Sequence, residues 1–315
     1  MSHLTLTFLG QFQLTLQDQP AIRFETDKVR ALLAYLVVEG NQAHSRSTLA
    51  ALLWPGYNEE NARTNLRHAL HQLRQTIGDA TATPPWLLIT RQTLQFNPAA
   101  PHTLDVQEFS TLLNRVAAHA HPRLDQCASC LQALRQAADL YRGDFLAGFA
   151  VNDSAPFEEW RRIKQEQLHL RAVELFQQLA RYSETVGDNQ LTRQYAARQL
   201  ELEPWREEAH RQIMRTLARS GQRNAALAQY QLCCRILAAE LILGPRTPLR
   251  RSMSRSAPVS FLAKKPRSRK IGRRLPGKRL NRQNSSRQFL ANPPATRCAM
   301  IGVTCPRSTS AKDAR

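Results

Sequence analysis

Residues 58–77, NEENARTNLRHALHQLRQTI, decide the fold of this 315-residue chain. Apolar side chains recur through this stretch at the i, i+3, i+4, i+7 and i+11 positions, which lie on one face of an α-helix. They form a continuous stripe that a hydrophobic core could bury, so the stretch predicts an amphipathic helix. The residues of the stripe are Leu66, Ala69, Leu70, Leu73 and Ile77.

The side of this predicted helix that faces away from the stripe is cationic and polar. Such side chains could contact phosphates and base edges if the helix entered a DNA major groove, where arginine pairs bidentately with guanine. The alternative interpretation is a solvated helix face without a partner. The residues concerned are Arg63, Thr64, Arg67, His68, His71 and Arg74.

Two shorter helices are predicted before this one. Apolar spacing indicates the first over about residues 29–37, ending at Gly40, and the second over about residues 49–53, with Ser45 or Ser47 as its N-cap. Three helices in this order are typical of a helix-turn-helix unit.

A β-hairpin is predicted after the long helix. Residues 86–90 and 93–97 are short β-rich runs joined through Arg91 and Gln92, so the tip of the hairpin carries a cation that could touch DNA. Alternating apolar residues also predict a small antiparallel sheet near the N-terminus. Its members are Leu4, Leu6, Phe8, Phe12, Leu14 and Leu16, continued by Ile22 and Phe24.

Residues 105–241 are helical by pattern and contain an internal repeat. Gly187-Asp188 and Gly221-Gln222 lie 34 residues apart, which is the period of a tetratricopeptide (TPR) helix pair. Stacked helix pairs bury their faces against neighbours and offer a surface to a partner. The large aromatic residues of this region are interpreted as core rather than as ligand contacts: Trp160, Phe176 and Trp205.

The chain resembles the bacterial transcriptional activators of the antibiotic-regulatory type, in which an OmpR-like winged helix precedes a TPR-like bacterial transcriptional activator domain. The resemblance covers residues 1 to about 240 and both regions in order. The matching stretches are Ser45-Arg46, Leu52-Leu53-Trp54-Pro55, Ala62-Arg63-Thr64-Asn65-Leu66-Arg67, Leu70-His71-Gln72-Leu73-Arg74, residues 140–146 (LYRGDFL), residues 200–205 (LELEPW) and Glu207-Glu208-Ala209-His210.

This resemblance implies a mainly α fold with a small β component, and an activator that binds direct repeats near promoters and contacts RNA polymerase. It places a winged-helix domain at residues 1–100 and a TPR-like domain at 101–241. Arg91 takes the role of the wing residue. The recognition-helix role falls on Arg63, Thr64, Asn65, Arg67, His68, His71 and Arg74.

Charge separates the C-terminal residues from the rest of the chain. Residues 241–315 contain 19 Lys and Arg against the single acid Asp313, whereas residues 1–240 contain 25 basic and 24 acidic residues. We expect residues 242–315 to be a disordered basic tail. It either binds nucleic acid without reading sequence, through counterion release, or is translated out of frame, which is the interpretation we favour.

The cysteines and the absence of a signal-like or bilayer-spanning apolar run favour a reduced, cytoplasmic setting. His119, His121, Cys127 and Cys130 could form a zinc site. Because their spacing is tighter than in common zinc fingers, the favoured interpretation is two helix cysteines one turn apart. We therefore predict no metal and no cofactor.

An enzyme is not predicted, because the chain contains no phosphate-binding loop, nucleophile elbow or dinucleotide fingerprint. Two other classes stay open: a TPR-type scaffold for protein partners and a non-specific nucleic-acid binder that acts through the tail. The expected partners are duplex DNA, RNA polymerase and a second copy of the chain in a homodimer or a repeat-bound oligomer, without a membrane. Many members of the family continue into an ATPase domain, so a longer native protein is also conceivable.

Overall fold

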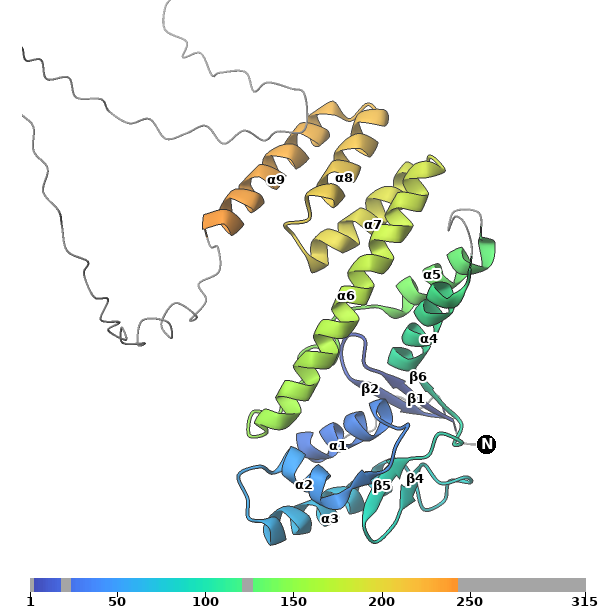
Figure 1. Cartoon of the computed structure of the whole chain (residues 1–315), viewed down its shortest axis with the longest axis vertical. Coiled ribbons are helices and arrows are strands. Elements are labelled where there is room, and N and C mark those ends of the chain that lie inside the picture. The colour runs from blue at the N-terminus through green and yellow to red at the C-terminus, as the bar shows by residue number, and fades with distance from the viewer. Residues whose placement is uncertain (1–2, 18–23, 121–126, 243–315) are drawn as a thin grey trace, which may run out of the picture. The chain divides into compact units, whose positions relative to one another are not determined.

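The computed structural model describes residues 3–17, 24–120 and 127–242. The chain divides into two units, residues 1–248 and 249–315, and the description concerns the first. Its elements are shown in Figure 1. In chain order they are β1 (Leu4–Thr7), β2 (Gln13–Leu16), α1 (Asp27–Val38), β3 (His44–Ser45), α2 (Arg46–Leu53), α3 (Glu59–Thr76), β4 (Leu87–Ile89), β5 (Thr93–Phe96), β6 (His102–Leu104), α4 (Asp105–Ala118), α5 (Ala128–Leu140), α6 (Ala155–Thr185), α7 (Asn189–Leu202), α8 (Glu207–Arg219) and α9 (Arg223–Ile242).

The first sheet has the strand order β2-β1-β6. The predicted antiparallel pairing is confirmed, with Leu4 opposite Leu16. The predicted continuation is wrong at Phe24, which lies in no strand, while Ile22 falls outside the described residues. The third strand is β6, which runs parallel to β1. A three-residue strand is too short to show the two-residue period from which strands are predicted.

The three predicted helices are present, and each begins at a side-chain cap. The capping oxygens belong to Thr26, Ser45 and Asn58. Of the two predicted candidates, Ser45 and not Ser47 is therefore the N-cap residue of α2. The predicted hairpin forms strands β4 and β5, and the two-residue strand β3 extends its sheet to the order β3-β5-β4. This arrangement is a winged helix.

The apolar stripe of α3 packs into the core as its spacing predicts. Leu66 is 1% exposed and Leu73 and Ile77 are fully buried, and α3 contacts both α1 and α2. Burial of a leucine side chain of this kind contributes about 1.5–3 kcal/mol, so the stripe fixes which face of α3 is left for solvent.

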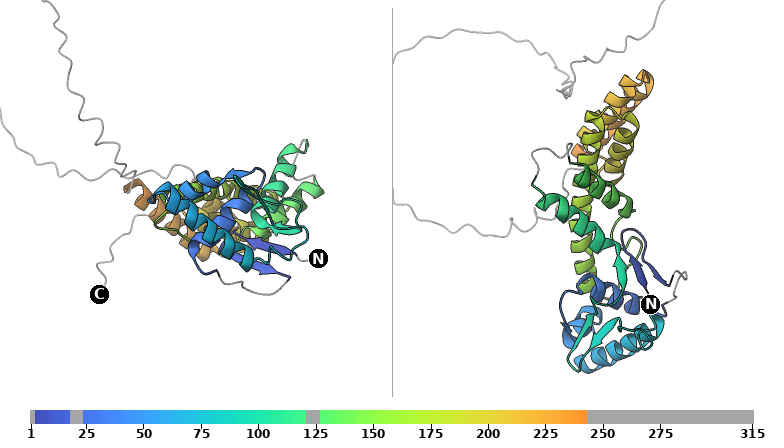
Figure 2. Two further views of the ribbon diagram at one scale, coloured as in Figure 1. Left: turned by 90° about the horizontal axis from the view of Figure 1, so that it is seen from below. Right: turned by 90° about the vertical axis from the view of Figure 1, so that its right-hand side faces the viewer.

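The helical repeat is also confirmed. Gly187 and Gly221 follow the ends of α6 and α8 with φ angles of 79° and 74°, a left-handed conformation that glycine adopts without a Cβ clash. The helices pack successively, α6 on α7, α7 on α8 and α8 on α9. The right-hand view of Figure 2 shows these helices one beside the next. The order is that of stacked TPR-like hairpins.

The three large aromatics of this region differ in burial. Phe176 is 2% exposed, and Trp160 is half-buried, so both belong to the core or its margin. The prediction is wrong for Trp205, which is 48% exposed. Trp205 lies in the turn between α7 and α8.

Glu39, at the C-terminal end of α1, connects this helix with α6. Its Oε1 atom accepts hydrogen bonds from the Trp160 indole (2.9 Å) and lies 2.8 Å from the Lys164 ammonium. Burial works to raise the pKa of Glu39, but the Lys164 and Trp160 hydrogen bonds hold that pKa below its ordinary value. The ionised form is therefore stabilised by the fold.

Asp105 connects the first sheet with the start of α4. Its carboxylate is 5% exposed and accepts backbone N–H bonds of 2.8–2.9 Å from Phe8, Leu9 and Val106. Burial raises the pKa of Asp105 even though these donors favour the charged form. Asp105 thus accepts hydrogen bonds from its neighbour Val106 and from Phe8 and Leu9, which lie nearly a hundred positions earlier in the sequence.

The LYRGDFL stretch, residues 140–146, docks against the turn between β1 and β2. Leu9 and Phe145 form an antiparallel bridge, and the N–H of Gly10 donates to the carbonyl of Asp144 (3.0 Å). Gly10 has a φ of +116°, and a Cβ there would lie 3.6 Å from the Cβ of Arg142. This stretch of the family pattern thus has a structural role.

Candidate nucleic-acid interface

The outward face of α3 carries the residues that the sequence singles out. At about 100° per residue, Thr64, Arg67, His68 and His71 fall within an arc of about 100° on the side opposite the buried stripe. Arg67, His68 and His71 are exposed, while Thr64 is half-buried. The structure therefore brings four of the predicted residues together on one accessible surface.

Figure 1 shows α3 beside the β4–β5 hairpin, with α1 and α2 above it in this view. The N-terminal turn of α3 is fixed by Asn58, whose Oδ1 accepts the N–H of Asn61 at 2.8 Å. Glu59 and Glu60 follow in the first turn, where they complement the helix dipole. The cationic part of the helix therefore begins after these two carboxylates, at Arg63.

Arg63 is exposed and forms an i,i+4 ion pair of 2.5 Å with Glu59. The side chains are 55% and 71% exposed, and such solvated pairs contribute little to stability. Arg63 can therefore exchange Glu59 for a phosphate at small cost. The Arg67 guanidinium donates to the Thr64 hydroxyl at 3.0 Å, which orders its side chain along the outward face.

Arg74 and Asn65 lie at the margins of this face. Arg74 donates through Nε to the carboxylate of Asp79 at 2.9 Å, and Asp79 is 3% exposed. The same carboxylate accepts the N–H of Leu87 at the start of β4 (3.0 Å). Arg74 thus neutralises a buried charge that ties α3 to the hairpin. Asn65 is half-buried on the opposite margin.

Arg91 is exposed at the tip of the hairpin, as predicted. The Thr90 hydroxyl accepts the N–H groups of Gln92 (3.1 Å) and Thr93 (2.8 Å), and these bonds close the two-residue turn around Arg91. A cation on a short, internally bonded turn loses little entropy when it meets a phosphate.

Sequence reasoning missed a residue that positions the wing. Arg46, the first residue of α2, donates through Nε (3.2 Å) and Nη2 (2.9 Å) to the carbonyl of Thr90, and its N–H donates to the carbonyl of Gln92 (2.8 Å). The only sequence signal was its presence in a family-like stretch. Its role depends on the β3–β5 pairing, which no local pattern revealed.

A winged helix followed by stacked helix pairs is the architecture that the sequence resemblance implies. The family model described as "Bacterial transcriptional activator domain" matches residues 104–255. The match assigns this domain to residues 104–255, and the winged helix before it lies outside the matched residues.

A solved structure shares the fold. It is described as "Mycobacterium tuberculosis EmbR in complex with low affinity phosphopeptide" and aligns with a TM-score of 0.56 and 21% sequence identity. The alignment covers 80% of this chain but 64% of that one, so the chain spans under two thirds of that protein. No curated protein matches the sequence.

No helix in residues 3–17, 24–120 and 127–242 is both long enough and apolar enough to cross a bilayer.

Proposed function

We propose that this activator binds duplex DNA in a sequence-specific way, with the outward face of α3 in the major groove and the β4–β5 wing against the backbone. The observation that carries the proposal is the shared exposure of Arg67, His68 and His71 on the face opposite the core. Arg63 and Arg91 flank this face and supply phosphate contacts. Thr64 and Asn65 complete the predicted set, and Arg74 acts mainly through the fold.

The proposal assigns residues 1–100 to DNA binding and residues 101–241 to contacts with RNA polymerase or a second copy on direct repeats. Three large apolar side chains of the helical region are exposed, and we take them as the candidate contacts for such a partner. They are Leu170 at 54%, Trp205 at 48% and Leu227 at 53% exposure.

The test compares footprints of the full chain and two matched variants on genomic and randomised duplexes at two salt concentrations. Arg67→Ala removes a guanidinium from the outward face of α3. Arg162→Ala removes another exposed guanidinium, which belongs to α6 and not to that face. If Arg67 reads a base, its loss weakens specific binding by about 1–3 kcal/mol, roughly 5- to 150-fold.

The outcomes separate the proposed function from its rivals. Discrete repeated sites that Arg67→Ala weakens and Arg162→Ala leaves intact support the proposal. Uniform, salt-sensitive binding that neither variant alters assigns the affinity to the 19 cations of the tail. Binding to protein partners without any protected duplex assigns the chain to the scaffold class.

The activator role is tested separately by transcription with purified RNA polymerase on a footprinted promoter. We expect Trp205→Ala to preserve the footprint while lowering transcript yield, because Trp205 is far along the chain from α3 and exposed. Equal yield from both proteins would place the polymerase contact elsewhere.

A further inference from the structure

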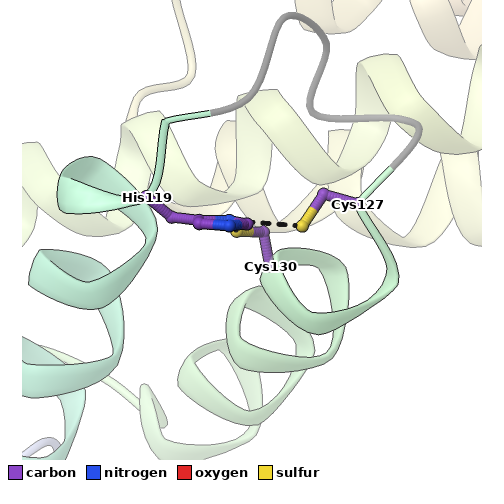
Figure 3. A group of neighbouring side chains, drawn as sticks. All are labelled: His119, Cys127 and Cys130. Atoms are coloured by element: carbon purple, nitrogen blue, oxygen red, sulfur yellow. Dashed lines mark hydrogen bonds between the residues drawn. The ribbon is translucent and has the colours of Figure 1, made fainter.

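Three ligand-type side chains meet where α4 ends and α5 begins (Figure 3). His119 is the C-cap residue of α4, Cys127 is the N-cap residue of α5, and Cys130 lies in the first turn of α5. The Nδ1 atom of His119 lies 3.0 Å from the sulfur of Cys130 and 3.4 Å from that of Cys127. All three candidate ligand atoms are within 4.8 Å of one another.

These separations are close to those around a bound zinc ion. With Zn–N near 2.1 Å, Zn–S near 2.3 Å and tetrahedral angles, a nitrogen and a sulfur lie about 3.6 Å apart and two sulfurs about 3.8 Å apart. The observed N–S distances of 3.0 and 3.4 Å would have to open by about 0.6 and 0.2 Å, respectively. Rotation of an exposed imidazole can supply this.

Ordinary core packing does not account for the arrangement. Cys130 is 3% exposed, but Cys127 is half-buried and His119 is exposed. The two cysteines are also not two helical residues one turn apart. Cys127 is the N-cap residue that precedes α5, and only Cys130 lies within the helix. The preference of cysteine for burial therefore explains one of the three side chains and not their convergence.

We propose that His119, Cys127 and Cys130 form a zinc site that joins the end of α4 to the start of α5. Two thiolates and one imidazole suit Zn²⁺ better than the hard cations Mg²⁺ and Ca²⁺, which take oxygen ligands. The Ser129 hydroxyl, 3.2 Å from the Cys127 sulfur, supports the site from outside the ligand set. A fourth position is taken by water or by another ligand.

The site has a structural role. Asp105 anchors the first residue of α4 to Phe8 and Leu9, which directly follow strand β1, so zinc at His119 would fix the other end of the same helix against its neighbour α5. This proposal replaces the prediction of no metal, which rested on the spacing of the residues and on the preference of cysteine for burial. The proposal does not depend on DNA binding and can fail or succeed independently of it.

The test uses the full chain, reduced and stripped of metal with a chelator under anaerobic conditions. Co²⁺ is added first, because thiolate ligation gives a charge-transfer band in the near ultraviolet and tetrahedral geometry gives strong visible absorption. Zn²⁺ is then added to displace it. We expect one equivalent of Co²⁺ with both spectral signatures, and full displacement by one equivalent of Zn²⁺.

Variants assign the site. Cys127→Ser and Cys130→Ser should each abolish the charge-transfer band or weaken Co²⁺ affinity at least 100-fold, and His119→Asn should weaken it at least 10-fold. Cys234→Ser, which alters a half-buried thiol in α9, is the matched control and should bind as the wild type does. Retention of the wild-type spectrum in both Cys127→Ser and Cys130→Ser overturns the proposal, as does a wild-type chain that binds no Co²⁺.

Folding is checked independently of the spectra. His119 is exposed, so His119→Asn should keep the far-ultraviolet circular dichroism of the wild type. Zn²⁺ should raise the melting temperature of the wild type and of Cys234→Ser, and leave that of Cys127→Ser unchanged. An equal rise in Cys127→Ser contradicts a site at these residues.

Discussion

Replacement of Asp105 by asparagine tests how the first sheet is joined to the helical region. The substitution keeps the size of the side chain but exchanges one carboxylate oxygen for an NH₂ group. In the native chain the two oxygens accept the N–H groups of Phe8, Leu9 and Val106. An amide has one acceptor oxygen, so it can keep Phe8 and Val106 while its NH₂ group faces the N–H of Leu9.

The expected loss follows from these contacts. One buried N–H without an acceptor costs about 1–3 kcal/mol, and the two remaining bonds weaken because a neutral acceptor replaces a charged one. Removal of a buried charge, whose desolvation raises the pKa of Asp105, offsets part of this. Asp105→Asn should therefore lower the free energy of unfolding by about 2–4 kcal/mol.

Urea unfolding of the full chain, followed by circular dichroism, measures the effect. Asp139→Asn is the matched control, because Asp139 is exposed on α5 and should change stability by less than about 0.5 kcal/mol. If Asp105→Asn unfolds at the same urea concentration as this control, Asp105 does not hold β1 to α4 and the reasoning is refuted.

Three further substitutions test the described contacts. Glu39→Gln should destabilise the chain near neutral pH, because Glu39 is ionised there and pairs with Lys164. The loss of stability should shrink as the pH falls below about 4.5, since the pKa of Glu39 is lowered in the folded chain. Melting curves that show the same loss at every pH would contradict the pairing. Arg46→Ala should loosen the wing and weaken DNA binding by about 0.5–1.5 kcal/mol in gel-shift titrations without lowering the melting temperature appreciably, whereas unchanged affinity would show that the wing needs no support from α2. Arg74→Ala should lower the free energy of unfolding by about 1–2 kcal/mol, because it leaves the carboxylate of Asp79 without its cation. A variant that loses DNA affinity but no stability would show instead that Arg74 contacts DNA.

The elements that could be predicted from the sequence are those whose signals are local. The stripe from Leu66 to Ile77 and the hairpin around Arg91 each depend on residues within a few turns of one another. Gly187 and Gly221 reveal the helical repeat for the same reason. These signals were sufficient for a winged helix followed by stacked helix pairs.

The features that were missed depend on pairs of residues far apart in the chain. Strand β6 forms by pairing with the edge of β1, and strand β3 forms by pairing with β5. In the sequence, Arg74 has the same helical spacing as the other cations of α3. Its different role depends on the turn after α3, which places the buried Asp79 beside it. The prediction for Trp205 failed because hydrophobicity alone does not say whether a facing helix is present.

Strand β6 also bears on how such proteins can be recombined. The family match begins at Leu104, the last residue of a strand that completes the sheet of the preceding region. An activator domain transplanted onto a different DNA-binding module therefore has to supply an edge strand and a carboxylate that fit the new host. The two modules of this architecture are interchangeable only between proteins whose sheets accept the same strand.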